Sequence, residues 1–329
     1  QFRFGGTTIT GSVTSSGTGV VSFDAGTHTL EASSTVTGQD IRFSGSNTAT
    51  VSGTYTPVNT TINKNVNFNN GARTLQNINL QNYTWGGDSD VTISNELNWT
   101  GGYIQRTGLT TLGSAATWSI SGGRSLLSDF RNEGAITWLS GGMSIQAGAT
   151  FTNAGTLDIQ ISGNEVWGAG ANFDNTGTIT KTVTDRIAWL DSAFTSSGSV
   201  EVSTGMLQFR FGGTTITGSV TSSGTGVVSF DAGTHTLEAS STVTAQDIRF
   251  SGTDTATVSG TYSAGNTTIS AGTVDMSSSS GGAPGSFNLM GGTLIPPPRL
   301  EIHGDFVRTS GTYNHAGNTL AFVGGTAQD

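Results

Sequence analysis

The chain contains no cysteine among its 329 residues. Disulfide bonds and thiolate metal ligands are therefore excluded, and the fold must be held together by backbone hydrogen bonds and packing. Charged residues are also few, at 11% of the chain, where about 25% is usual in soluble domains. Because 33% of the residues are hydrophobic, this is not the composition of a charge-driven disordered chain, and we expect a folded protein.

Basic residues are outnumbered by acidic ones, 13 against 22, which gives a net charge of −9 at pH 7. They are scattered singly, so the sequence offers no basic patch for a phosphate backbone and predicts no nucleic-acid partner. Long hydrophobic runs are missing too, and with no run of about 18 apolar residues we expect no membrane insertion of this segment. The chain starts at Gln1 without a leader and ends within an apparent further unit, so we expect it to be a segment of a longer protein.

What the sequence has in abundance is repetition. Residues 1–55 return at 208–262 with three changes, at Gly38, Ser46 and Asn47, which become Ala245, Thr253 and Asp254. Such near-identity indicates a recent duplication. It is typical of architectures that grow in one direction by adding similar units.

Apolar and polar residues alternate along much of the chain. Phe2 and Phe4 flank Arg3, and Leu207, Phe209 and Phe211 share one parity while Gln208 and Arg210 have the other. A period of two broken by glycine and serine predicts short strands with one buried face, which here would carry all three of Leu207, Phe209 and Phe211. No segment sustains helical spacing.

A second period lies in the middle of the chain. Similar heptapeptides begin at Phe130, Phe151, Phe173 and Phe194, at separations of 21, 22 and 21 residues. This spacing predicts one coil of a β-solenoid, with the four phenylalanines in an inward column. Asn132, Asn153 and Asn175 are expected to form an amide ladder at a turn, and the glycines that follow them to adopt positive φ.

The predicted fold class is therefore all-β: an elongated, right-handed parallel β-helix with about 21–22 residues per coil in its middle region. We expect residues 1–329 to form one continuous solenoid, with middle coils at 63–205. The serine-rich stretch and the three consecutive prolines within 277–298 predict an irregular loop or a unit boundary, because proline cannot donate to a strand ladder. Residues 299–329 are predicted to be a final, incomplete unit.

All six tryptophans precede residue 190. Packing in the core or at corners is the favoured interpretation. The alternative is an exposed aromatic stripe that stacks on sugars. Their positions are Trp85, Trp99, Trp118, Trp138, Trp167 and Trp189.

Candidate catalytic groups are sparse. Asp88 and Asp90 would share a strand face, as would His303 and Asp305, and Asp185 adjoins Arg186. A glycan lyase or hydrolase would need clustered carboxylates or a basic group on one exposed face, but solvated turn residues are the favoured interpretation of these pairs. A metal site from His303, Asp305 and His315 is the weaker alternative. The sequence thus predicts no catalytic, cofactor-binding or metal-binding residue, and no cofactor.

The duplication bears on the remaining candidates. Arg3, Asp24, His28 and Glu31 recur as Arg210, Asp231, His235 and Glu238. Two nearly identical active sites are a less simple explanation than two copies of one structural unit.

Threonine pairs suggest one more class of function. Thr8 and Thr10, like Thr178 and Thr180, lie on one strand face, and stacked rows of this kind could order ice-like water. The pairs do not repeat at coil spacing, so ordinary strand propensity is the favoured explanation.

The coils resemble those of very large bacterial surface proteins, the autotransporter and filamentous-haemagglutinin-like adhesins. The resemblance rests on residues 97–102 (LNWTGG), on the Phe-x-Asn-x-Gly-Thr coils, and on Gly304-Asp305-Phe306 with the residues at 311–315 and 320–322. It implies export, a right-handed parallel β-helix and a stalk or adhesive filament. It carries over no functional residue.

We therefore expect a non-catalytic extracellular protein of the cell surface, a rigid structural or adhesive element. Its expected partners are copies of itself, bound end to end, or host and environmental surfaces and glycans. A carbohydrate-active enzyme on the same fold is the alternative, and an ice-binding protein is a third hypothesis.

Overall fold

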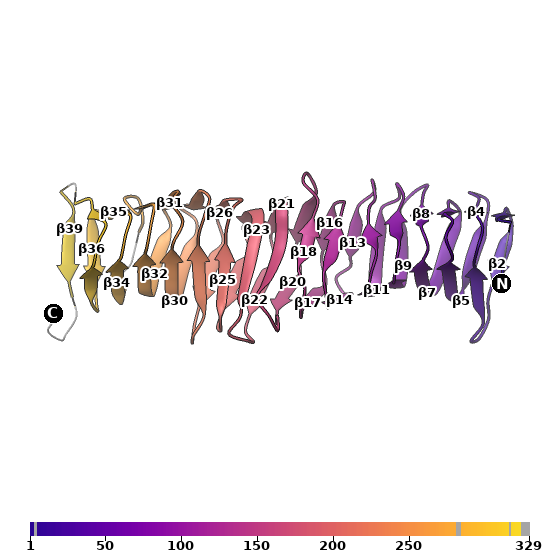
Figure 1. The fold of residues 1–329 in the computed structure, drawn as a ribbon, viewed down its shortest axis with the longest axis horizontal. Helices are drawn as coiled ribbons and strands as arrows, with labels where there is room; N and C mark the ends of the chain where they lie inside the picture. The colour runs from indigo at the N-terminus through magenta and orange to yellow at the C-terminus, as the bar shows by residue number, and fades with distance from the viewer. Residues whose placement is uncertain (3–4, 281–283, 316, 324–329) are drawn as a thin grey trace. The chain divides into compact units, whose positions relative to one another are not determined.

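A computed structural model describes residues 1–2, 5–280, 284–315 and 317–323. In this part of the chain every strand pairs in parallel with strands of neighbouring coils and no helix is present, which confirms a parallel β-solenoid. The chain divides into two compact units, residues 1–156 and 157–329. Within each unit the strands follow one another in chain order (Figure 1).

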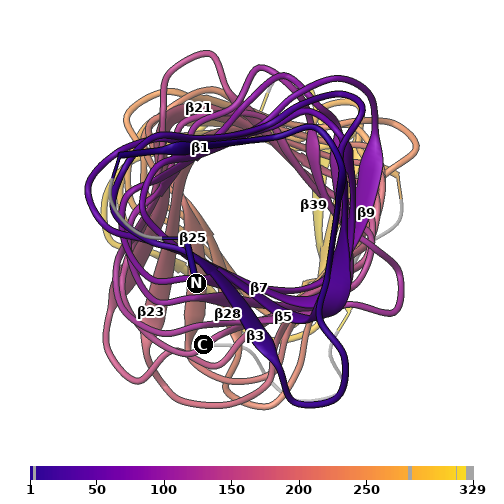
Figure 2. The same cartoon turned by 90° about the vertical axis from the view of Figure 1, so that its right-hand side faces the viewer.

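Strands lie on three sides of each coil, as Figure 2 shows for β1, β9 and β3 of the first unit. The strands of this unit are β1 (Thr7–Ile9), β2 (Ser12–Thr14), β3 (Val20–Phe23), β4 (His28–Leu30), β5 (Thr35–Ser44), β6 (Ala49–Val51), β7 (Thr54–Asn63), β8 (Val66–Phe68), β9 (Arg73–Leu80), β10 (Thr84–Gly86), β11 (Val91–Trp99), β12 (Tyr103–Ile104), β13 (Thr110–Leu112), β14 (Thr117–Ile120), β15 (Arg124–Leu126), β16 (Phe130–Asn132), β17 (Ala135–Trp138), β18 (Met143–Ile145) and β19 (Thr150–Asn153).

The strands of the second unit repeat this arrangement. They are β20 (Thr156–Ile159), β21 (Glu165–Asn175), β22 (Thr178–Lys181), β23 (Ile187–Ser196), β24 (Ser199–Val202), β25 (Met206–Phe209), β26 (Thr214–Ile216), β27 (Ser219–Ser222), β28 (Val227–Phe230), β29 (His235–Leu237), β30 (Thr242–Phe250), β31 (Thr255–Val258), β32 (Thr261–Ile269), β33 (Thr273–Asp275), β34 (Ser286–Leu289), β35 (Thr293–Ile295), β36 (Arg299–Ile302), β37 (Phe306–Arg308), β38 (Thr312–Tyr313) and β39 (Thr319–Phe322).

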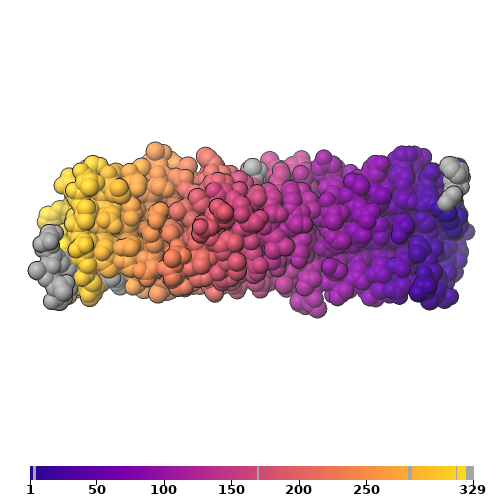
Figure 3. All heavy atoms as spheres, turned by 60° about the horizontal axis from the view of Figure 1, so that its bottom comes forward, coloured from indigo at the N-terminus to yellow at the C-terminus, as the bar shows by residue number. Residues whose placement is uncertain are grey.

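The alternating sequence explains the strands. Along β23 buried and partly exposed residues alternate almost throughout, because successive side chains of a strand point to opposite faces. The inward set fills the interior of each unit, and closely packed side chains cover the face of each unit seen in Figure 3.

The predicted columns form at the predicted period. Phe130 pairs with Phe151, with stacked ring centroids 5.8 Å apart, and Phe173 packs on Phe194 at 5.4 Å. All four rings are buried. In the first unit the buried Asn132 donates from Nδ2 to Oδ1 of Asn153, 21 residues further on, at 2.7 Å. Asn175 meets Ser196 in the equivalent contact, so the amide ladder is confirmed between Asn132 and Asn153.

The glycines at this corner are required for a different reason from the one predicted. Gly134 and Gly155, which follow Asn132 and Asn153, do not have positive φ. Instead, a Cβ at Gly155 would overlap the carbonyl oxygen of Gly134, and a Cβ at Gly198 that of Gly177. The corner leaves no room for a side chain because each coil lies directly on the carbonyls of the coil before it.

The segment 277–298 is more regular than predicted. It contains the strands β34 and β35, which are separated by a turn at residues 290–292. Strand pairing survives because the three prolines follow β35 rather than interrupt it. Residues 281–283 of this segment lie outside the described residues, as do Arg3, Phe4 and residues 324–329 of the predicted final unit.

Candidate functional site

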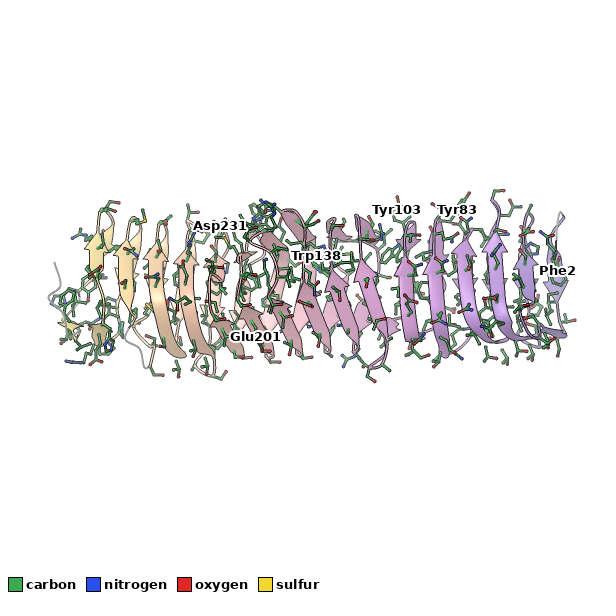
Figure 4. All side chains as sticks on the ribbon, turned by 90° about the horizontal axis from the view of Figure 1, so that it is seen from below. Phe2, Tyr83, Tyr103, Trp138, Glu201 and Asp231 are labelled. Carbon is green, nitrogen blue, oxygen red and sulfur yellow. The ribbon has the colours of Figure 1, made fainter. Side chains whose placement is uncertain are left out.

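A cluster of polar and aromatic side chains lies on the outer face of the second unit, where β23, β25 and β28 are neighbours. On β23, Ala188 and Leu190 are buried, while Trp189 and Asp191 point outward. Trp189 pairs in register with Gln208 of β25. We call the group formed by Trp189, Asp191, Gln208, Arg210, Phe211 and Asp231 the outer cluster (Asp231 is labelled in Figure 4).

Arg210 is the centre of the outer cluster. Its Nε and Nη2 atoms donate to the two carboxylate oxygens of Asp191, at 2.6 and 3.0 Å. Its guanidinium carbon lies 4.5 Å from the ring centroid of Trp189 and 5.1 Å from that of Phe211. The side chains of Arg210 and Asp191 are only 22% and 12% exposed. A two-point ion pair held between two rings and largely shielded from water is fixed in position.

A short hydrogen-bond chain extends the cluster along the face. The indole Nε1 of Trp189 donates to Oε1 of Gln208 at 2.8 Å, and Nε2 of Gln208 donates to a carboxylate oxygen of Asp231 at 2.9 Å. Each bond joins adjacent coils, so the amide orientation is set by both neighbours. The charged groups of the cluster, Asp191, Arg210 and Asp231, add up to one negative charge.

Phe211 is the exposed member, and here the sequence-based prediction was wrong. Leu207 and Phe209 are buried as predicted, but Phe211 is 68% exposed. Strand β25 ends at Phe209, and Phe211 then adopts a φ of 66°, which turns its side chain out of the alternation.

This left-handed backbone is held in place by its surroundings. The Phe211 N–H donates to the carbonyl of Ala232 at 2.7 Å. A Cβ at Gly212 would overlap the backbone of Ser192 and Ala193, so the turn lies tightly against the preceding coil. A strained conformation persists only where the surrounding structure fixes it, and such sites are often functional.

The other five tryptophans pack in the core, as the favoured interpretation of the sequence predicted. Trp85, Trp99, Trp118, Trp138 and Trp167 are all at most 1% exposed. Trp189 alone of the six is partly exposed. Little in the sequence separates it from the others, except that it lies two residues before an acid in a strand of alternating pattern.

The candidate carboxylates join coils rather than converge. Asp88 accepts a hydrogen bond from the N–H of Asn70 at 3.1 Å, and Asp90 accepts one from the N–H of Leu109 at 2.9 Å. The two acids therefore contact coils on opposite sides of their own. Asp185 and Arg186 form an exposed pair with 3.8 Å between charged atoms.

The suggested metal ligands do not come together. Among the described residues no group of three or more histidine, aspartate or glutamate side chains could hold a metal ion. His303 and Asp305 lie between β36 and β37, and His315 stacks on Tyr313 with ring centroids 6.4 Å apart.

The duplicated histidines lie in matching buried pockets. The ring Nε2 of His28 is 3.0 Å from the carbonyl oxygen of Asp24, and that of His235 is 2.8 Å from the carbonyl oxygen of Asp231. Their Nδ1 atoms are buried without a hydrogen-bond partner in the described part of the chain. Nε2 therefore carries the proton of a neutral ring. Burial lowers the pKa of both histidines below the ordinary value, more than their carbonyl partners raise it.

These pockets predict an acid-sensitive stability. Because the folded-state pKa lies below the unfolded value near 6.5, the unfolded chain binds more protons as the pH falls through that value, and stability declines. We expect the urea midpoint to fall from pH 7.5 to pH 5.5. The fall should be smaller in the double variant His28→Gln/His235→Gln, which keeps a donor without the titrating ring. If the urea midpoint fell equally in the unaltered protein and in the double variant, the two histidines would not be the source of the acid sensitivity.

Buried cations are a feature that sequence reasoning missed. Lys64 is fully buried, and its Nζ donates to the carbonyl oxygens of Asp24 and Gly26 at 2.7 and 2.8 Å. Lys181, also fully buried, donates to the carbonyl oxygen of Thr184 at 3.0 Å. Burial lowers the pKa of both amines. These cations donate to corner carbonyls that lie outside the strands.

The threonine pattern also differs from prediction. Thr8, Thr29 and Thr50 are in register on consecutive coils of the first unit. Thr215, Thr236 and Thr257 repeat this column in the second. A threonine pair also recurs at coil spacing, because Thr35 and Thr37 of β5 are in register with Thr54 and Thr56 of β7.

Comparison with known proteins identifies no relative of this chain. No family model matches it, and neither a curated protein nor a solved structure matches it. Among the described residues there is also no helix with the length and hydropathy needed to cross a membrane.

Proposed function

We propose that this chain is a non-catalytic, extracellular structural and adhesive protein, whose coils form part of a bacterial surface stalk or filament. The supporting observation is that outward-facing polar side chains bind the next coil. Asn59 donates to Asp40 at 2.7 Å, and Asn77 donates to Asn59 at 2.8 Å. Asn95 continues the series by donating to Asn77.

A ladder of this kind adds cohesion along the direction in which coils stack. Asn59 and Asn77 each donate to one neighbouring coil and accept from the other, so separating two coils breaks a side-chain bond in addition to the backbone bonds. Asp88 and Asp90 act in the same sense through backbone N–H groups. Outer side chains used in this way suit a load-bearing element of a stalk or filament.

The alternative function is a carbohydrate-active enzyme on the same fold. The outer cluster is the feature that favours it, because Asp191 binds Arg210 and Asp231 is linked to the same group through Gln208. However, both carboxylate oxygens of Asp191 are held by Arg210, which opposes the proton transfer that a catalytic acid must perform.

Electron cryo-microscopy of the purified protein tests the structural proposal. We expect fibres or stalks in which strands repeat at about 4.8 Å along the long axis. The matched assay is release of reducing ends from a panel of polysaccharides. Glycan cleavage that is lost in Asp191→Asn would contradict the non-catalytic proposal and support the enzyme.

A further inference from the structure

We propose that the outer cluster is a binding site for neutral glycans, in which a hexopyranose ring stacks on Phe211 and its hydroxyl groups bind Arg210 and Asp231. This inference deepens the adhesive part of the proposed function and rests on it. It assigns the ligand class and the residues that recognise it.

Phe211 supplies the apolar surface. The residue is 68% exposed, although an exposed phenylalanine side chain does not stabilise the fold. The backbone bond to Ala232 and the close approach of Gly212 to β23 fix the turn that presents it. A ring held in advance loses little conformational entropy on binding, and a pyranose offers a matching face of C–H groups.

Arg210 supplies polar groups beside that ring, and Asp231 supplies others on the adjacent coil, next to the Ala232 carbonyl that binds the Phe211 N–H. Nε and Nη2 of Arg210 are occupied by Asp191, whereas no acceptor in the described part of the chain is bound to Nη1. The two N–H groups of Nη1 can therefore donate to the hydroxyl oxygens of a sugar. Asp231 accepts from Gln208 at 2.9 Å and from Ser251 at 3.4 Å, and its carboxylate has lone pairs left for a hydroxyl donor. An aromatic face with a few fixed polar groups beside it is the composition of a small-ligand site.

The charge of the cluster selects among glycans. Asp191 neutralises Arg210, and Asp231 leaves the group with one negative charge on a chain whose net charge is −9. Uronic acids and sulfated sugars would be repelled by this field. Neutral hexoses carry no such penalty, so the site favours them.

Affinity electrophoresis provides the test, with mixed-linkage β-glucan, galactomannan and dextran as probes and polygalacturonate as the acidic comparator. We expect at least one neutral polysaccharide to retard the protein and polygalacturonate not to. Phe211→Gly should weaken retardation about tenfold, the scale of one lost aromatic contact. It should not lower the thermal midpoint, because glycine adopts positive φ without strain.

Tyr83→Gly is the matched control. Tyr83 is also an exposed aromatic, at 43%, with a φ of 68°, but no arginine stacks on it in the described structure. Figure 4 shows it on the first unit beside Tyr103. Binding should be unchanged in this variant. Trp189, the one partly exposed tryptophan, should become less accessible to acrylamide quenching when the glycan is bound.

Three results would overturn the inference: no retardation by any neutral probe, equal binding by Phe211→Gly and the unaltered protein, or preference for polygalacturonate. Fibres without glycan binding would refute this site and leave the structural proposal intact. Release of reducing ends would refute the non-catalytic proposal instead.

Discussion

Replacing Arg106 with methionine is expected to destabilise the protein by about 3–5 kcal/mol, because two buried charge-assisted hydrogen bonds, each worth about 1.5–3 kcal/mol, are lost. Arg106 is 7% exposed, and its guanidinium donates to the carbonyl oxygens of Gly86, at 2.9 Å, and Ser89. It also lies 5.0 Å from the ring centroid of Trp85. Burial lowers its pKa to about 10, so it remains charged at neutral pH. Methionine fills similar space but leaves two buried carbonyls without a donor.

Urea denaturation at pH 7, followed by tryptophan fluorescence, measures this effect. Arg131→Met is the control, because Arg131 is 42% exposed and binds Glu133 at the surface. Exposed pairs of this kind contribute about 0–1 kcal/mol, so its midpoint should hardly move. If the two variants had equal midpoints, the buried arginine would not be structurally important.

Replacing Gly155 with alanine is expected to cost about 3 kcal/mol or more. The added Cβ would overlap the carbonyl oxygen of Gly134 and the backbone of Glu133. Overpacking usually costs about 1–3 kcal/mol when side chains can move aside. Here the neighbour is backbone in a stacked coil, so relief requires two coils to separate.

Gly11→Ala is the control for that substitution. Gly11 also lies in the first unit and has no positive φ, and a Cβ added to it would have no other atom within 4 Å. Alanine there should be neutral or stabilising by about 0.4–1 kcal/mol, because it restricts the unfolded chain. Similar thermal midpoints for the two alanine variants would show that the corner can widen.

The solenoid was predictable because its coils are repeated in the sequence. The phenylalanine heptapeptides gave the period, and with it the contact of Phe130 with Phe151 and of Asn132 with Asn153. The local alternation of apolar and polar residues predicted the strands. Both signals arise from nearest-neighbour stacking, which leaves the same residue type at the same place in successive coils.

The buried cations and the outer cluster were not predictable in the same way. Lys64 and Arg106 occur singly and look like surface residues until the corner carbonyls are located. Phe211 continues the alternation of β25 in sequence, and only the left-handed turn shows that it faces outward. Trp189 and Arg210 meet because strand register places their coils side by side. These features depend on where the chain turns, which the repeat does not specify.

The two near-identical segments have a genetic consequence that follows from their shared register. Thr7 faces His28 in the first copy and Thr214 faces His235 in the second, and Val13 and Val220 likewise meet Val36 and Val243. Unequal crossing-over between their coding sequences would remove or insert 207 codons while leaving each remaining coil against a partner it already fits. The length of this protein can thus change in a single recombination event, without any substitution to repair the junction.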